Sequence, residues 1–348
     1  MRERTCYLDI ARVVSMICVI AIHVGAISWY DPPYEWYPWF VYNAWDCVSR
    51  FCVPVFLMIS GCIFLDPGRD ITPKKLYTKY IPRILAAYFF WSALYAVISS
   101  GFVTQRVLSK EVVQKFGESL IFGHYHQWYL YIILGLYLVT PALRAVAANE
   151  EATRYFLILS GIVGYLIPTL QQIPVLKGTV RYTERIDIAV VTGYIFYYLF
   201  GYYIGGRTQS KNEVRIWYLI GLLGLIATCT LTYLTCHYEG YPDIAMHEYG
   251  TIHVALYSCG VFVFFKNRFA SVDPSSRIMK VVFWLSKLSF AIYLAHDFGL
   301  IVFRKIGFVP ASFNAFLSMP ILILLDLIIS VAIAYCASKI PKWNKYIC

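Results

Sequence analysis

Long apolar runs separated by short polar segments are the most regular feature of this sequence. An α-helix needs about 20 mainly apolar residues to cross a bilayer, and most of the runs approach that length. They lack the strict alternation of apolar and polar positions that is typical of an outer-membrane β-barrel, so we expect helices. Ten spans are predicted, at residues 8–29, 45–65, 81–99, 128–146, 155–170, 189–205, 216–235, 251–265, 281–303 and 313–337.

The predicted fold class is therefore all-α, a polytopic membrane helix bundle of about ten transmembrane helices. The first run could also be a secretory signal peptide, because basic residues precede it. However, no small-x-small cleavage site follows, and Arg12 and His23 interrupt the run, so we expect a retained helix. The longest predicted loop, 101–127, is too short for a soluble domain, and residues 1–348 are predicted to form one transmembrane domain.

The composition supports this prediction and excludes other classes of protein. Hydrophobic residues make up 59% of the chain and charged residues 14%, with a mean hydropathy of +0.60. A soluble domain has about 25% charged and 45–50% apolar residues, so a soluble chain of this composition would lack the polar surface to cover itself. Intrinsic disorder is excluded as well, because disorder requires low hydrophobicity.

The net charge of +10 predicts the orientation of the helices. Lys and Arg gather in the cytoplasmic loops of membrane proteins, so the excess indicates topology rather than a nucleic-acid partner. Of the 30 basic residues, 19 fall on the side of the amino terminus and eight on the opposite side, while Arg12, Arg50 and Lys287 lie within or at the edge of a span. We therefore expect both termini in the cytoplasm.

The ten cysteines show neither a CxxC motif nor a paired spacing. Most of them lie in apolar runs, where Cys behaves as a small apolar side chain. We expect neither a disulfide framework nor a zinc site, although one bridge between Cys47 and Cys236 stays open as an alternative.

Arg12 and His23 are the ionisable residues that interrupt the first predicted span. An ionisable group inside a bilayer costs about 2.5–3.5 kcal/mol on insertion scales, which makes it a functional candidate. The two residues are eleven positions apart, and eleven helical steps make about 1100°, or three turns and roughly 20°, with a rise of about 16 Å. One helix face would thus carry a cation at one depth and a proton acceptor at another. The alternative is that Arg12 extends to the interface and His23 is a satisfied core histidine.

Arg50 is expected at the outer start of the second span, where it could hold an anion or simply anchor the helix at the interface. Pro54 follows and should kink this helix, because proline removes a helical hydrogen bond. The small pair Ser60-Gly61 comes next and should let another helix approach closely.

A cationic cluster precedes the third span. Lys79 and Arg83 are four residues apart and therefore share one helix face, with Lys74 and Lys75 just before them. The cluster could hold the phosphates of a cytosolic donor, or it could be a plain consequence of the positive-inside rule.

Histidines gather toward the predicted outer side. His124 and His126 precede the fourth span, and His296 lies in the outer half of the ninth span, beside Asp297. Imidazole titrates near neutral pH, so histidines from different helices could share the roles of base and acid. The spacing fits no metal motif such as His-Glu-x-x-His, and we predict no metal site.

The first outer loop, 29–45, contains four tryptophans in a run rich in Tyr, Phe and Pro. Aromatic rings stack on sugar faces, so the loop could cradle a glycan. Tryptophan and tyrosine also gather at membrane interfaces because they are amphipathic, which is the alternative interpretation.

Five segments of the chain, in order, resemble the membrane acyltransferase-3 family. Residues 8–12, with ten residues between Arg12 and His23, are similar to its first helix, whose hallmark is Arg-x10-His. The other matching segments are 53–61, 126–130 with Tyr137 and Pro141, 196–201 and 285–296. The Ser49-Arg50 variant and the chain length most resemble the subgroup of the enterobacterial common antigen O-acetyltransferase, and the membrane domain of vancomycin-resistance serine racemases is also similar. Two positions depart from the pattern, because Val13 replaces a frequent Gly and Lys79 a common Arg.

The resemblance implies a bacterial O-acetyltransferase, a multi-pass protein of the inner or plasma membrane. It would take an acetyl group from cytoplasmic acetyl-CoA and transfer it to a hydroxyl of a cell-surface or lipid-linked saccharide. Acetyl-CoA, a saccharide acceptor and membrane lipid are thus the expected partners, with no nucleic acid.

The resemblance also implies roles for residues. His23 would be the general base or a transient acyl acceptor, with His126 as its partner. Arg12 and Arg50 would hold anionic groups or a developing oxyanion. Nucleotide phosphates would be bound by Lys75, Lys79 and Arg83, and the substrate by Trp128, Tyr293 and His296.

Two other classes of function stay open. A transporter of a small polar solute, such as an amino acid, also needs charged groups inside the membrane. A ligand-sensing membrane module is the third interpretation. Stabilisation by acetyl-CoA, or its hydrolysis, would distinguish the enzyme from both.

Overall fold

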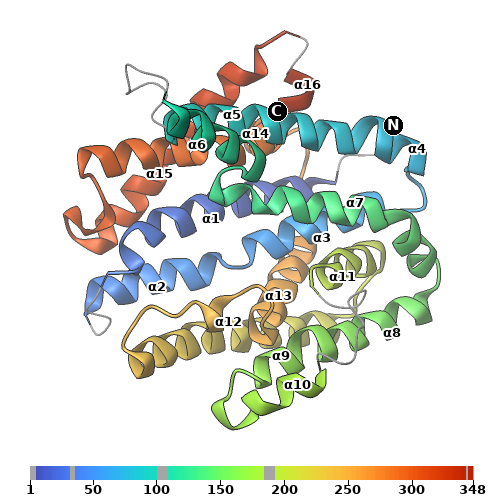
Figure 1. Ribbon diagram of the computed structural model, residues 1–348. Helices are drawn as coiled ribbons and strands as arrows, with labels where there is room; N and C mark the ends of the chain where they lie inside the picture. Colours follow the sequence, from blue (N-terminus) through green and yellow to red (C-terminus); the bar gives the residue numbers. More distant parts are fainter. Residues whose placement is uncertain (1–4, 32–35, 100–108, 184–192, 342–343, 348) are drawn as a thin grey trace.

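The computed structural model describes residues 5–31, 36–99, 109–183, 193–341 and 344–347, and all regular secondary structure in these residues is helical (Figure 1). Short turns of π-helix and 3-10 helix connect or extend the α-helices. The π-helical turns are η1 (Leu76–Tyr80) and η3 (Gly161–Leu166), and the 3-10 turns include η2 (Tyr125–Gln127) and η6 (Ala245–His247). The α-helices are α1 (Cys6–Trp29), α2 (Tyr37–Ser49), α3 (Cys52–Phe64), α4 (Pro73–Lys75), α5 (Ile81–Ser99), α6 (Lys110–Phe122), α7 (Trp128–Ala147), α8 (Glu150–Ser160), α9 (Ile167–Leu170), α10 (Val180–Thr183), α11 (Ile195–Gly206), α12 (Lys211–Glu239), α13 (Ile252–Phe269), α14 (Arg277–Ile306), α15 (Ala315–Ser338) and α16 (Asn344–Ile347).

Nine segments of the described chain are long and apolar enough to cross a membrane, which confirms the predicted class of polytopic helical membrane protein. They correspond to nine of the ten predicted spans. The remaining prediction, 189–205, begins outside the described residues, and its described part lies in α11.

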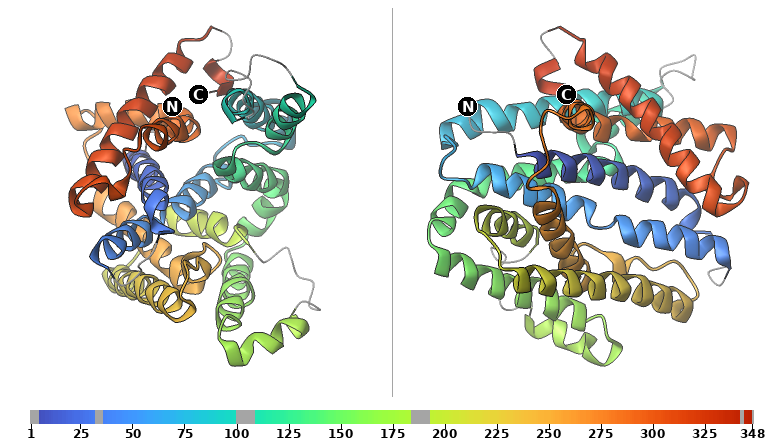
Figure 2. Two further views of the ribbon diagram at one scale, coloured as in Figure 1. Left: turned by 60° about the vertical axis from the view of Figure 1, so that its left-hand side comes forward. Right: turned by 180° about the vertical axis from the view of Figure 1, so that it is seen from behind.

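Helix α1 lies in the middle of the bundle and contacts α2, α3, α13, α14 and α15 (Figures 1 and 2). Ala11, Met16 and Val24 on this helix are completely buried. Its 24 residues correspond to a length of about 36 Å, which is enough to cross a hydrocarbon core of about 30 Å. The residues of α1 are therefore presented to the interior of the protein along the full depth of the membrane.

The second span differs from its prediction, because it begins at Tyr37 and is interrupted between α2 and α3. Residues 37–44 were predicted to belong to the outer loop 29–45, yet they lie within α2, where the polar residues Asn43 and Asp46 are both buried. Arg50 was wrongly expected at the outer start of this span, because it follows thirteen helical residues at the interruption. Pro54 lies in the first turn of α3, where its missing N–H leaves no helical hydrogen bond unmade.

Glycines bring α3 and α11 into direct backbone contact, as the Ser60-Gly61 pair predicted. A Cβ atom added to Gly61 would lie 1.8 Å from the carbonyl oxygen of Tyr198, and one added to Gly201 would lie 2.1 Å from that of Met58. The predicted close approach is therefore confirmed, with α11 as the partner helix.

Two basic side chains cap helix ends at one end of the bundle. The Arg144 Nη1 atom of α7 donates to the carbonyl of Phe64, at the end of α3, over 2.7 Å. The Lys266 Nζ atom of α13 donates to the carbonyl of Ile204, near the end of α11, over 2.5 Å. Cations are favourable at these carbonyl-rich ends. We call this end, where α1 and α14 begin and α3 and α15 finish, the inner end, because its loops are predicted to be cytoplasmic.

Candidate active site

Three histidines from three different elements meet near the opposite, outer end of the bundle. They are His23 of α1, His126 of η2 and His296 of α14. The ring of His296 lies 4.8 Å, between centroids, from each of the other two rings. His126 and His296 are fully buried and His23 is half-buried. The structure therefore brings together the three histidines that the sequence placed on separate helices.

A capped turn holds His126 in place. The backbone N–H of His124 donates to the Gln127 side-chain oxygen over 2.7 Å, and the N–H of Gln127 donates back to the carbonyl of His124 over 2.8 Å. The hydroxyl of Tyr293, on α14, donates to the carbonyl of His126. These bonds tie the turn before α7 to α14.

The rings of His126 and His296 each leave one nitrogen without a described partner. The Nδ1 atom of His296 lies 2.5 Å from the carbonyl oxygen of Tyr293, and since that oxygen can only accept, Nδ1 carries the proton. Its Nε2 atom is then an acceptor, and both this atom and His126 Nε2 are buried without a hydrogen bond among the described residues. Buried unpaired nitrogens cost stability, so a ligand or water that completes them is expected here.

Asp297 joins this cluster to the surface, although sequence reasoning gave it no role. Its carboxylate accepts from the Tyr125 hydroxyl over 2.8 Å and from Arg304 Nη2 over 3.1 Å, and lies 3.4 Å from His124 Nε2. The Tyr125 hydroxyl is in turn 3.4 Å from His23 Nδ1. Asp297 does not face its neighbour His296 but reaches His23 through Tyr125. The sequence feature that could have identified Asp297 as a site residue is its charge within an apolar span.

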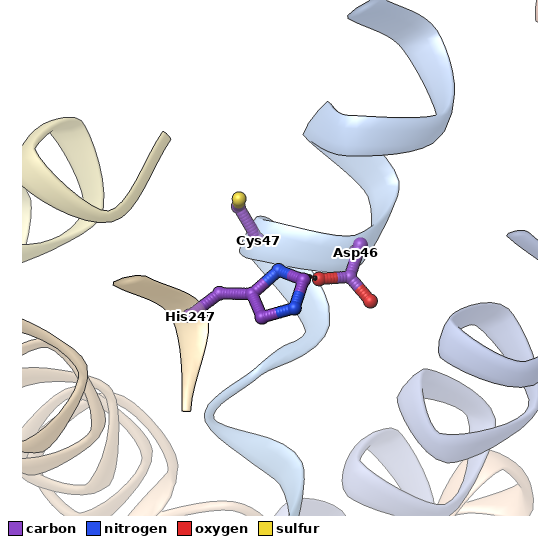
Figure 3. Close-up of side chains that lie close together, drawn as sticks. All are labelled: Asp46, Cys47 and His247. Carbon is purple, nitrogen blue, oxygen red and sulfur yellow. Dashed lines mark ion pairs between the residues drawn. The ribbon is translucent and has the colours of Figure 1, made fainter. Parts of the chain in front are cut away.

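A second polar cluster surrounds Arg50, and Figure 3 shows two of its members, Asp46 and His247. Its guanidinium donates to both carboxylate oxygens of Asp46, over 2.8 and 2.7 Å, and lies 3.3 Å from His247 Nε2. The His247 Nδ1 atom is 2.9 Å from Asp46 Oδ2. Arg50 also lies over the ring of Tyr249, 5.6 Å from its centroid. This is an arginine held rigidly inside the protein rather than an interfacial anchor.

Two groups of possible metal ligands occur in the described residues, Asp46, Cys47 and His247 (Figure 3) and His124, His126 and Asp297. In each group the carboxylate already binds an arginine, Arg50 or Arg304. A divalent cation would have to compete with that guanidinium. We therefore assign no metal to either group.

Both clusters line one cavity of about 530 Å³, which we call the outer cavity. His23, His126, Arg50, Trp128 and Tyr293, all predicted as site residues, contribute to its wall. His296, predicted to bind substrate, packs against the rings of His23 and His126 and does not line the wall. The further polar wall residues are Tyr30, Tyr125, Tyr129, Tyr194, Glu248, Tyr249 and Arg304.

Arg12 faces the interior of the bundle rather than the membrane interface. Its Nη1 atom donates to the Ser286 hydroxyl of α14 over 3.1 Å and lies 3.5 Å from Asp9 Oδ1. Arg12 also lines a cavity of about 140 Å³, the middle cavity, together with Ser60 and Ser289. The middle cavity shares four wall residues with the outer cavity: Val19, Val53, Tyr129 and Tyr293. Arg12 and His23 thus line neighbouring cavities, as their common helix face predicted.

Lys79 and Arg83 line a third cavity, of about 910 Å³, at the inner end. The Arg83 guanidinium lies 5.9 Å from the ring centroid of Phe290, which lines the middle cavity. Lys75 is not part of this inner cavity, because its ammonium group pairs with Asp70. The prediction that Lys75 belongs to the same binding site is therefore not supported by its position.

The structure also bears on two alternatives that the sequence left open for the outer side. Cys47 and Cys236 are free thiols, so the alternative of a bridge between them is not realised. Trp29 and Trp39 are buried at 2% exposure and serve neither as a membrane belt nor as a glycan platform. Only Trp36, at 62% exposure, is an open tryptophan among the described part of that loop; residues 32–35 lie outside the described residues.

The family of this chain is shown by comparison with known proteins. A family model described as an acyltransferase domain matches residues 7–338. The provisionally named membrane-bound acyltransferase YfiQ of Bacillus subtilis (strain 168) is 22% identical, over 75% of this chain and 71% of its own. A provisionally named poly-β-1,6-N-acetyl-D-glucosamine export protein of Staphylococcus aureus (strain MSSA476) is 19% identical, over 81% of this chain and 78% of its own. No solved structure matches the chain.

Proposed function

The chain belongs to the acyltransferase-3 family of multi-pass membrane proteins, and on that premise we propose that it is an O-acetyltransferase of a bacterial inner or plasma membrane. The donor would be acetyl-CoA from the cytoplasm, and the acceptor a hydroxyl of a cell-surface or lipid-linked saccharide. The observation that carries the proposal is the order of the three cavities. A cationic cavity lies at the inner end, a histidine-lined cavity lies toward the outer end, and Arg12 lines the cavity between them.

The reaction sets what the outer cavity must do. The acceptor oxygen forms a bond to the acetyl carbon, the carbon–sulfur bond of the thioester breaks, and the hydroxyl proton ends on the CoA thiolate. A base near the acceptor hydroxyl makes that oxygen a better nucleophile. His23 is the candidate, because its ring lines the cavity and its Nδ1 side faces the Tyr125 hydroxyl.

The bonds around His23 suit a general base. Tyr125 donates its hydroxyl proton to Asp297, so its oxygen can accept from His23 Nδ1–H, and His23 Nε2 is then left to take the proton of the acceptor. His126 is the partner residue nearby, because its buried ring lies 4.8 Å from that of His296 and its Nδ1 atom lies 3.0 Å from His124 Nδ1. Arg50, fixed by Asp46, and Arg12 are the cations that would stabilise the oxyanion or hold anionic groups of the reactants.

The acceptor class rests on the wall chemistry and on a relative. Trp128, Tyr194 and Tyr249 add aromatic rings to the outer cavity, and Glu248 and Arg304 add hydrogen-bonding groups for hydroxyls. The Staphylococcus aureus relative is named for the export of a polysaccharide. That name also favours a second candidate function, translocation of a polar solute through the same cavities.

Reconstitution of the purified protein in lipid nanodiscs separates these candidates. We expect the reconstituted protein to release CoA from acetyl-CoA when acceptor saccharide is supplied. In cells, mass spectrometry of surface glycans should show an acetyl group that is lost when the protein is deleted. His23→Ala should lower the transfer rate by about 10²- to 10⁴-fold, the range expected for loss of a general base.

The matched control is His237→Ala, because His237 is an exposed histidine of α12 that stacks on Tyr233 away from the cavity. It should leave the rate unchanged. A folded His23→Ala protein with undiminished acetyl transfer would sink the assignment of His23. A wild-type protein that is not stabilised by acetyl-CoA and never consumes it would favour the translocator.

A further inference from the structure

The inner cavity is built from four separate segments of the chain. They are the turn before α5 with its first residues, the middle of α14, the last turns of α15, and α16. Five cations line it: Lys79, Arg83, Lys287, Lys339 and Lys345. None of the described residues in its wall is acidic.

The positive-inside rule does not explain this convergence. The rule concerns the number of basic residues on one side of the membrane and not the direction in which they point. Lys74, Lys75 and Lys280 lie at the same end of the bundle and contribute nothing to the cavity wall. The five cations that do line it therefore indicate a multiply anionic ligand.

The C-terminal part of the wall combines cations with aromatic rings. The Lys339 ammonium group lies 4.8 Å from the ring centroid of Tyr335, and that of Lys345 lies 4.8 Å from the centroid of Tyr346. Trp284 of α14 is close to Tyr335, with 6.4 Å between ring centroids. Such a wall offers positive charge for a phosphate beside flat apolar surface for a purine.

Helix α16 is docked against the bundle rather than extended from it. The Trp91 indole of α5 donates to the carbonyl of Ile347 over 3.2 Å, and Ile347 is completely buried. Figure 1 shows α16 beside α5, at the edge of the molecule. Lys345 and Tyr346 are thereby held at the cavity by the buried residue that follows them.

The position of Arg83 gives the ligand a direction. Arg83 lies against Phe290, and Ile84 and Phe290 line the middle cavity that leads toward His23. The thioester arm of the donor would have to enter there, which puts the pyrophosphate beside Lys79 and Arg83. The opposite end of the donor, an adenosine that carries a 3′-phosphate, then faces the C-terminal wall.

We propose that Lys339 and Lys345 form a subsite for the ribose 3′-phosphate of CoA, with the adenine against Trp284 and the neighbouring tyrosines. This inference rests on the proposed function in one respect only, the identity of the donor as a CoA thioester. It adds a specificity for the 3′-phosphate, which acetyl transfer itself does not require.

The test compares CoA with dephospho-CoA, which lacks only the 3′-phosphate, by equilibrium binding to the full chain in phosphatidylcholine nanodiscs. The wild-type protein should bind CoA about tenfold or more tightly than dephospho-CoA, as expected for a charge-assisted phosphate contact. The double variant Lys339→Gln/Lys345→Gln should lose that preference, with its affinity for dephospho-CoA unchanged. Unchanged binding of dephospho-CoA also reports an intact fold.

Two controls accompany the double variant. Lys280→Gln removes an exposed cation at the same end of α14 that does not line the cavity, and it should keep the full preference for CoA. Lys339→Arg/Lys345→Arg keeps the charges and should also keep a preference for CoA.

Three results would overturn the subsite. Equal wild-type affinity for CoA and dephospho-CoA would refute it while leaving acetyl-CoA as donor. If the Gln double variant lost affinity for CoA and for dephospho-CoA to the same extent, the lysines would not recognise the 3′-phosphate. The third result concerns nanodiscs that contain phosphatidylglycerol. If the Gln double variant lost binding of that lipid but kept the wild-type affinity for CoA, the two lysines would form a lipid headgroup site. By contrast, absence of any binding of CoA or acetyl-CoA to the wild-type protein would refute the proposed donor itself.

Discussion

The outer and inner cavities both contain several ionisable side chains, but they hold them in opposite ways. In the outer cavity, His126 is 1% exposed and Arg50 is fixed by two hydrogen bonds to one carboxylate. In the inner cavity, Lys79, Arg83, Lys287, Lys339 and Lys345 are all exposed. A reaction needs groups in fixed orientation, whereas a multiply charged ligand can be bound by mobile cations. The contrast therefore favours chemistry at the outer cavity and binding at the inner one.

The largest expected difference concerns stability. Asp46→Ala would leave Arg50 buried without its carboxylate, and breaking such a pair from one side costs about 3–5 kcal/mol of unfolding free energy. At the inner end, Asp70→Ala removes a carboxylate that is 69% exposed from its pair with Lys75, which should change stability by less than about 1 kcal/mol. Chemical unfolding of both variants in the same detergent measures the two effects. Similar losses of unfolding free energy in the two variants would contradict the proposed difference between the two ends of the molecule.

A smaller effect, on the reaction rate, is expected for Asp297, which connects Tyr125, His124 and Arg304. Asp297→Asn removes the charge that binds Tyr125 and Arg304, and the loss of a charged hydrogen bond is worth about 10- to 100-fold in rate. If Asp297 positions Tyr125 for His23, kcat should fall while the affinity for CoA stays constant. Steady-state kinetics together with equilibrium binding of CoA separate the two quantities. A fall in CoA affinity instead would indicate a general structural role.

The inner cavity should respond in the opposite sense. Arg83→Gln removes a cation from the predicted pyrophosphate position, so the KM for acetyl-CoA should rise about tenfold with kcat nearly unchanged. Lys280→Gln is again the control for the loss of one positive charge. If kcat fell with KM unchanged, Arg83 would act on the transition state and the division between the two cavities would be wrong.

The smallest effect is expected at Lys75, which the sequence predicted to bind the donor and the structure places outside the inner cavity. Lys75→Gln should change the KM for acetyl-CoA by less than about twofold, because its ammonium group faces Asp70 outside the inner cavity. Initial rates at several acetyl-CoA concentrations suffice for this test. An increase as large as that of Arg83→Gln would restore Lys75 to the binding site.

Sequence periodicity and hydropathy predicted what depends on neighbours along the chain. The spans, the common face of Arg12 and His23, and the tight contact at Gly61 are of this kind. Arg50 was misplaced because the aromatic- and proline-rich run before Trp45 was interpreted as a loop, although the helix begins at Tyr37. Only His247, 197 residues after Arg50, completes the environment in which Arg50 and Asp46 are held inside the protein. Asp297 was noticed but left without a partner, since adjacent helical residues do not face each other.

The cationic cluster shows the same limit. Lys75 and Lys79 are equivalent by local sequence, and their different positions follow from Asp70 and from the distant walls of the cavity. Lys339 and Lys345 carried only a topology signal, because nothing local ties them to Arg83. Pairings of this type arise from the packing of whole helices and cannot be read from one segment.

The capping of helix ends by Arg144 and Lys266 has a consequence for experiments that alter membrane orientation. Both residues belong to the positive charge that predicts a cytoplasmic inner end, and both also bind the last carbonyls of α3 and α11. Replacing them by neutral residues to invert the protein would uncap those helices at the same time. Insertion and folding thus draw on the same side chains here, so reporter assays of topology should alter Lys74 or Lys280 instead.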